Sequence, residues 1–305
     1  MTFLFRTAPR SVVLFLLITI GCGAGSSDQL EIPDTPDGTV RVVLDGLAQH
    51  HPEIVWNAMP ASYQQDVSDL TRDFAETVDP AVFDRAVAVA RKGVVVLQSK
   101  KGLILSSQYL EQSQVDVETA DVLWEASVHM IDSLLASDLA DLATLREIDV
   151  EAFLSTTGTA LMDSAAEMPA EGDEMVSFSQ RVAVWEQTEV ELLSKDGDRA
   201  VVLLTIPDEE PIEMPMVFIE DRWIPTELST GWPVAVDQAR SRIEMLGSDE
   251  AAQIRVQVLF GIGIFEGFID QIDLMETTDE FDDLVGGVLG NVMATQGGPA
   301  AMTEG

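Results

Sequence analysis

Residues of the types that perform chemistry are few in this chain of 305 residues. It has a single cysteine, Cys22, and three histidines, His50, His51 and His129. Adjacent histidines diverge in a helix or a strand, and no H-E-x-x-H spacing occurs, so we expect no metal site. His129 could act as a base, but the serines near it lie on the same predicted helix, where no sharp turn exposes a nucleophilic hydroxyl. No phosphate-binding loop or dinucleotide-binding pattern occurs, so we expect no cofactor.

Carboxylates are abundant instead. The chain has 53 acidic residues against 17 basic ones, a formal net charge of −36. Pairs of carboxylates suited to acid–base chemistry are inevitable at this density, so a carboxylate-dependent hydrolase stays open without pointing to particular residues. A field of this sign repels phosphate groups, which argues against a nucleic-acid partner.

Cys22 has the most specific placement of these residues. Two arginines are the only charges before the apolar run Val12–Ile20, and Gly21-Cys22 closes that run ahead of further small residues. The run is too short for a membrane-spanning helix, which needs about 20 residues. A basic start, a short apolar stretch and small residues at its end are typical of a secretory signal peptide, which we place at residues 1–21.

The segment Thr19-Ile20-Gly21-Cys22 resembles the lipobox of bacterial lipoproteins, at which the signal is cleaved and the cysteine acylated. The resemblance implies lipidation at Cys22, with chains such as palmitate holding the mature protein to the lipid bilayer on the extracytoplasmic side of the cell envelope. Two acyl chains anchor a protein stably, whereas one holds it only reversibly. Gly23, in place of an Asp retention signal, implies the outer membrane if the source is Gram-negative. Residues 22–38, rich in Gly, Ser, Pro and Asp, would form a flexible tether.

The rest of the chain predicts a helix-rich α+β fold that begins with helices. Residues 39–170 have a helical pattern, clearest after Pro60, where apolar residues recur every three or four positions through Val78. Asp79-Pro80 should cap and begin the next helix, and Lys100-Lys101-Gly102 should end it.

Later helices are predicted with less defined ends. The apolar stripe over 117–142 fits one helix, or two if Ser137-Asp138 caps a second. Trp232-Pro233 precedes the return of helical spacing near the C-terminus. The remaining helices are expected over 150–166, 236–245, 249–275 and 277–292.

Between these helical regions, residues 180–226 predict a small antiparallel β-meander of three or four strands. Lys195-Asp196-Gly197-Asp198 is typical of a hairpin turn. Val201–Ile206 is apolar at consecutive positions, as in a central strand covered on both faces. Pro215 should make its strand an edge strand or introduce a bulge. The expected strands are 188–194, 199–206, 212–219 and 222–225.

The meander and the C-terminal helices, residues 176–295, should pack with the helical region as one body, leaving 296–305 as a frayed tail. Within the C-terminal helices the stretch Phe260–Gly267 contains three glycines, each of which costs a helix about 1 kcal/mol relative to Ala. Two interpretations remain open: close helix–helix packing in the core, or an apolar groove or partner surface.

The helices ahead of a short meander loosely resemble small α+β folds of the NTF2-like and cystatin-like kind, especially at Val201–Leu204 and Ile219–Trp223. That resemblance implies a bent sheet wrapped on helices around an apolar pocket. The candidate residues for such a pocket, or for a partner surface, are Trp223, Trp232, Phe260, Phe265 and Phe268.

We therefore carry three hypotheses forward from the sequence. The first is a membrane-tethered extracytoplasmic lipoprotein with a non-enzymatic role in binding an envelope protein or supporting the envelope. The second is a carrier of a small apolar ligand in an NTF2-like pocket, and the third is the carboxylate-dependent hydrolase.

Overall fold

The structure, a computed structural model, describes residues 31–112, 115–168 and 177–296. The signal peptide, Cys22, most of the tether and all but the first residue of the expected tail 296–305 lie outside the described residues. The expected end of the tether at residue 38 is wrong, because Pro36 already begins helix α2 and Thr35 caps it. The helices are α2 Pro36–Ala48, α3 Glu53–Asn57, α4 Ala61–Thr77, α5 Pro80–Leu105, α6 Gln108–Gln112, α7 Val117–Ala136, the 3-10 turn η2 Asp138–Ala140, α8 Leu142–Arg146, α9 Val150–Leu154, α10 Thr157–Glu167, α11 Phe178–Gln187, α12 Thr226–Leu246, α13 Asp249–Leu274 and α14 Thr278–Gln296. The strands are β1 Glu189–Asp196, β2 Arg199–Thr205, β3 Ile212–Ile219 and β4 Arg222–Pro225.

The predicted α+β class is confirmed. A single antiparallel sheet of order β1-β2-β3-β4 lies between helices on both sides of it in the sequence. Within the described residues, no helix combines the length and the apolar character needed to cross a bilayer.

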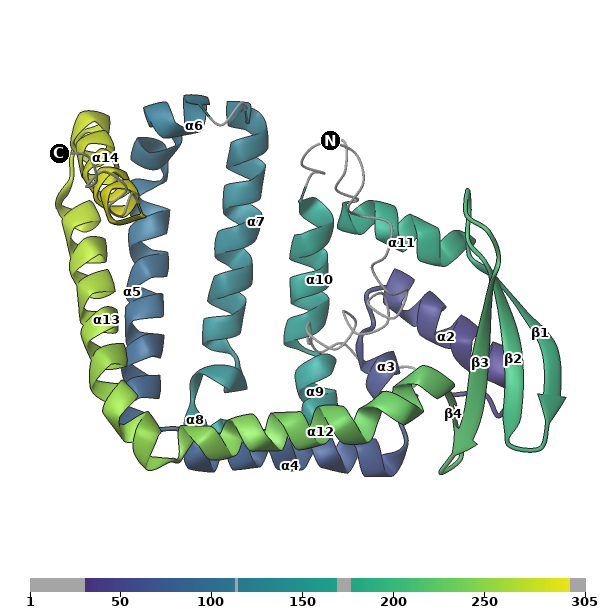
Figure 1. Ribbon diagram of the computed structural model, residues 1–305. Coiled ribbons are helices and arrows are strands. Elements are labelled where there is room, and N and C mark those ends of the chain that lie inside the picture. Colours follow the sequence, from purple (N-terminus) through teal and green to yellow (C-terminus); the bar gives the residue numbers. More distant parts are fainter. Residues whose placement is uncertain (1–30, 113–114, 169–176, 297–305) are drawn as a thin grey trace, which may run out of the picture.

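Two pairs of helices form nested corners that set the shape of the molecule (Figure 1). α4 and α12 lie side by side as a base, and each turns sharply at its end into an upright helix, α5 and α13 respectively. The two corners lie next to each other, and they are joined by an ion pair between Arg255, near the start of α13, and Asp79, at the start of α5. Further along, Lys92 pairs with Asp270, so α5 and α13 run parallel.

The upright helices stand in one layer rather than in a bundle. α13 packs against α5, α5 against α7, and α7 against α10, in the order in which they stand above the base in Figure 1. A helix in a single row has neighbours on only two sides, and α13, at the end of the row, has α5 on one side alone. Apolar side chains on its other sides therefore lack cover from this row.

The sheet lies at the opposite end of the base and is covered by helices on both faces at its β3–β4 side. Val202, Met216 and Trp223 are nearly inaccessible and pack on one face against Val40 and Leu44 of α2. The alternate residues of β3 and β4 face the core around α4 and α12, as expected from the two-residue period of a strand. The sheet therefore packs with one face against α2 and with the other against the base helices α4 and α12.

The junction between sheet and base is an aromatic stack. The rings of Tyr63 on α4 and Trp232 on α12 are parallel within 2°, with centroids 4.4 Å apart. The indole Nε1 of Trp232 donates a hydrogen bond of 2.9 Å to Oδ2 of Asp66. Met59 and Ile224 complete this buried cluster, which therefore holds α4, α12 and β4 together.

The predicted strands are close to the observed ones, but β3 pairs with both β2 and β4 and is an interior strand. The prediction of an edge strand or a bulge at Pro215 is therefore wrong for the strand as a whole. Pro215 pairs with Val201 of β2, and the pairing with β4 starts only at Met216. The proline thus occupies the stretch of β3 that has one neighbour, where its missing N–H is tolerated.

Several helix boundaries follow the predicted caps. The side chain of Asp79 accepts hydrogen bonds from the backbone N–H groups of Ala81 and Val82 at the start of α5. Ser137 ends α7, which confirms the break in the long stripe. The expected single helix over 150–166 is instead divided into α9 and α10.

Two expected helix ends are wrong for identifiable reasons. α5 continues past Lys100 and Lys101 to Leu105, because these lysines contact neighbouring segments instead of the helix end. The Nζ of Lys100 donates to the carbonyl oxygen of Met275, and Lys101 pairs with carboxylates of α7. α12 begins at Thr226, ahead of its predicted start, so Pro233 lies inside the helix.

The aromatic junction generates a stability prediction. Trp232→Ala should lower the free energy of unfolding by about 3–5 kcal/mol, because it removes a buried ring, its stack on Tyr63 and its hydrogen bond to Asp66. Urea unfolding of the full chain, followed by circular dichroism, measures this loss. Leu274→Ala, at a side chain that is 81% exposed, is the control and should change stability by less than about 0.5 kcal/mol. Equal losses for the two variants would contradict the role of the stack.

Candidate functional site

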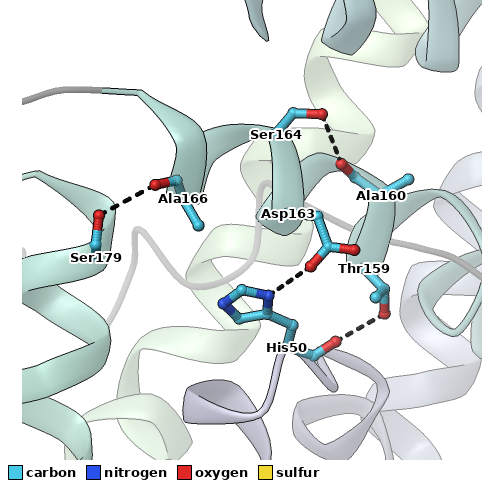
Figure 2. A network of polar contacts seen from close by, with 7 residues as sticks. All are labelled: His50, Thr159, Ala160, Asp163, Ser164, Ala166 and Ser179. Carbon is cyan, nitrogen blue, oxygen red and sulfur yellow. Dashed lines mark hydrogen bonds and ion pairs between the residues drawn. The ribbon is translucent and has the colours of Figure 1, made fainter.

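A network of polar contacts lies where the chain leaves α2 (Figure 2). His50 adopts a left-handed backbone conformation with φ 61°, which turns the chain from α2 toward α3. Its Nδ1 lies 2.6 Å from Oδ1 of Asp163 on α10. Thr159, one helical turn earlier on α10, donates its hydroxyl to the carbonyl oxygen of His50 at 2.7 Å. The network therefore fastens the end of α2 to α10.

A histidine–carboxylate pair acts in nucleophilic catalysis when its second ring nitrogen reaches a hydroxyl or thiol. The hydroxyls beside this pair are directed elsewhere, as Figure 2 shows. Ser164 donates to the carbonyl oxygen of Ala160 at 2.8 Å, and Ser179 donates to that of Ala166 at 3.1 Å. Among the described residues, the pair joins the end of α2 to α10.

The other histidines add no metal centre within the described residues. His51 Nδ1 lies 3.0 Å from Oε1 of Glu53, so the adjacent histidines contact different carboxylates, as expected from their divergence. His129 lies exposed on α7. In the described ranges no three His, Cys, Asp or Glu side chains converge in a way that could hold a metal ion.

The carboxylates with a shifted pKa are engaged in structural contacts. The hydrogen bond from Arg255 lowers the pKa of Asp79, and the backbone N–H of Ser62 lowers the pKa of Glu220. The pKa values of Asp69, Asp116 and Glu280 are also lowered, in each case chiefly by hydrogen bonds. A general acid at neutral pH needs the opposite shift, upward. These five groups therefore suit helix capping and ion pairing.

The aromatic residues that the sequence singled out do not form one surface. Trp223 and Trp232 are buried in two different clusters, and each indole N–H donates inside the fold, to the carbonyl oxygen of Asp34 and to Asp66 respectively. Phe268 packs beside the buried residues that join α13 to α5. Only Phe260 and Phe265 are exposed, 71% and 56% respectively.

Phe260 is one of several large apolar side chains that α13 exposes around its circumference. This helix leaves more large apolar side chains in contact with solvent than any other described element. The side that faces α5 is held by Ile269 and Ile272, which are buried, and by Glu266, which pairs with Arg85 and Lys92. The exposed apolar residues of α13 are Ile254, Val256, Val258, Phe260, Ile264, Phe265 and Leu274.

Packing within the described part of the chain does not explain the glycines of α13. A Cβ atom built on Gly261, Gly263 or Gly267 would meet nothing within 4 Å. Close packing in the core, one of the two interpretations of this stretch, is therefore wrong for all three positions. Gly46 behaves in the opposite way, because a Cβ there would lie 2.8 Å from the side chain of Ile54. The fold needs a glycine at 46, but not at these positions of α13.

Sequence reasoning identified the glycine-rich stretch and Phe260, but it missed Val256 and Leu274. The signal that could have found them is their spacing: Val256, Phe260, Gly263, Gly267 and Leu274 follow one another at intervals of 4, 3, 4 and 7, which puts them on one side of a helix. We call these five positions the α13 seam.

Comparison with known proteins gives no relative for this chain: no family model, no curated protein and no solved structure matches it. The arrangement of its own residues is therefore what indicates function.

The open space around the glycines generates a second prediction. Gly263→Ala and Gly267→Ala should each raise the free energy of unfolding by about 0.5–1 kcal/mol, since alanine favours a helix and its methyl group meets no neighbour. Gly46→Ala is the matched control and should lower it, because its methyl group collides with Ile54. Thermal unfolding of the three variants beside the parent chain measures the changes. A loss of stability at position 263 or 267 would mean that part of this chain covers the seam.

Proposed function

We propose that this chain is a lipoprotein of the bacterial cell envelope, tethered through acylated Cys22, whose folded part binds a partner and catalyses no reaction. The observation that carries the binding role is the α13 seam, whose side chains Val256, Phe260 and Leu274 are each more than two-thirds exposed. Soluble monomers seldom expose a contiguous apolar patch unless it serves an interaction.

The start of the fold supports a tether of limited reach. The hydroxyl of Thr39 donates to the carbonyl oxygen of Pro33 at 3.0 Å, which fastens the chain to α2 from that point. The segment from Cys22 to Pro33 spans at most roughly 40 Å when extended. α2 lies beside the sheet, and α13 stands at the other end of the base (Figure 1). A partner on α13 would therefore bind away from the point where the tether enters.

The packing of the sheet favours a surface over an internal ligand cavity. A carrier of the NTF2-like kind would hold its ligand between sheet and helices. Here that space on the α2 face is occupied by Val202, Met216 and Trp223, which are at most 3% exposed. The His50–Asp163 pair and the five carboxylates with a lowered pKa are engaged in the contacts described above. A binding role accounts best for the exposed features of α13.

The anchor is tested on the mature protein. Mass spectrometry of the membrane-extracted chain should find an N-terminus at Cys22 that carries acyl groups, because the lipobox resemblance predicts cleavage before this residue. Cys22→Ser should move the protein from the membrane to the soluble fraction, while Ser26→Ala, the matched control, should leave it in the membrane. A free N-terminus at Gly23 or Ser26 would contradict the anchor.

The binding role is tested separately in cells. A photo-crosslinking amino acid at Phe260 should give a discrete covalent adduct, because this side chain lies at the centre of the proposed contact. The same amino acid at Leu193, which is 46% exposed on β1, is the control and should give none. Equal labelling at both positions, or at neither, would count against a partner on α13.

A further inference from the structure

We propose that the α13 seam binds a basic amphipathic helix of another protein, which lies along α13 and approaches its backbone closely at Gly263 and Gly267. This inference rests on the proposed function, since it names the chemistry of the partner. It is carried by three observations: the spacing of the seam, the open glycines and the distribution of charge.

The spacing of the seam indicates a helix as the occupant. Phe260, Gly267 and Leu274 recur every seven residues, and Val256 and Gly263 occupy the alternating positions between them. This alternation of 3 and 4 is the pattern by which two helices pack at a crossing angle of about 20°. In Figure 1, α13 stands at the end of the row of upright helices, beside α5.

The seam faces away from the chain's own core. Ile262 and Ile269 each follow a seam residue by two positions, which is about 200° around a helix. Both pack in the cluster that joins α13 to α5. The seam therefore lies on the opposite side of α13, where no described residue comes within 4 Å of a Cβ built at Gly263 or Gly267.

The glycines indicate how close the occupant comes. With no Cβ at 263 or 267, a second helix can lie nearer to the backbone of α13 than larger residues would permit, as at small-residue helix interfaces. Each glycine costs the isolated helix about 1 kcal/mol, and nothing inside the described chain offsets that cost. Close approach to the backbone of α13 would not strengthen binding to a lipid surface, but it would strengthen packing of a second helix.

The distribution of charged residues along the seam favours a partner with basic side chains. Residues 256–283 contain no lysine and no arginine. Four exposed carboxylates lie at or just beyond the C-terminal end of the seam, and none of them forms an ion pair with a described residue; they are Asp273, Glu276, Asp279 and Asp283. Lysines or arginines flanking an apolar face would complement them. A second copy of this chain, with its own charge of −36, and an anionic membrane would both be repelled.

The test uses the full chain in detergent and three synthetic 21-residue peptides as probes. The first has leucine at heptad positions a and d and lysine elsewhere, the second has glutamate in place of lysine, and the third has the composition of the first in an order without a helical apolar face. Isothermal titration calorimetry measures binding. We expect the first peptide to bind at least tenfold more tightly than the other two, and to bind more weakly as salt is added.

Variants show whether binding occurs at the seam. The double variant Gly263→Leu, Gly267→Leu should weaken binding of the basic peptide at least tenfold, because two leucine side chains fill the close approach. Gly231→Leu is the matched control: a Cβ at 231 also meets nothing within 4 Å, and this residue lies near the start of α12. It should leave binding unchanged. Circular dichroism of each variant checks that the helices are retained.

Other results would overturn the inference. Equal binding of the basic and acidic peptides, or no effect of the double leucine variant, would exclude a basic helix on the seam. A molecular mass that doubles with concentration, and reverts in the double variant, would assign the seam to a second copy. Seam-dependent binding to phosphatidylglycerol vesicles would assign it to a membrane. An adduct from position 260 in cells, together with no peptide binding, would leave the proposed function standing and remove only this partner class.

Discussion

The stack of Tyr63 on Trp232 is the contact on which the architecture depends. It joins α4 to α12, and each of these helices continues through a sharp corner into an upright helix. Because the corners coincide at the pair of Asp79 and Arg255, the position of α4 against α12 also sets the position of α5 against α13. Ile224 of β4 packs into the same cluster, so the sheet is oriented from this point as well.

Helices that stand in a single row expose sides that they would bury in a bundle. In a bundle, each helix buries one stripe toward a shared centre, whereas here α7 contacts α5 on one side and α10 on the other. α13, at the end of the row, has only one neighbour within the row, α5. α13 therefore combines an ordinary buried side, formed by Ile269 and Ile272, with exposed apolar side chains that the described part of the chain does not cover.

Features encoded by neighbouring residues could be predicted from the sequence. The hairpin at Gly197, the cap at Asp79 and the break at Ser137 depend on local backbone preferences, and each occurs close to its predicted position. The four strands follow for the same reason. The C-terminal end of α5 could not be predicted in this way, since Lys100 contacts Met275, which is far away in the sequence.

The candidate site was predictable only in part. Periodicity shows that a helix has an apolar stripe, but not which neighbour covers that stripe. Trp232 and Phe260 are equally conspicuous in the sequence, yet one is buried beneath α4 and the other faces solvent. The glycines are similar: Gly46 and Gly263 differ only in whether another segment folds back against them, which is decided by long-range packing.

The junction also dictates the order in which the fold can be completed. Asp66 and Trp232, which hold it together, are 166 positions apart in the chain. α4 is synthesised long before α12, so the end of its apolar stripe at Tyr63 lacks its α12 partner until late in synthesis. The other end, at Phe74, packs against α8, which is made earlier. Local helices can form early, but the base closes only after the C-terminal third has arrived. Maturation of this protein is therefore governed by its last segments, and an incomplete chain exposes α4 as a surface on which aggregation can begin.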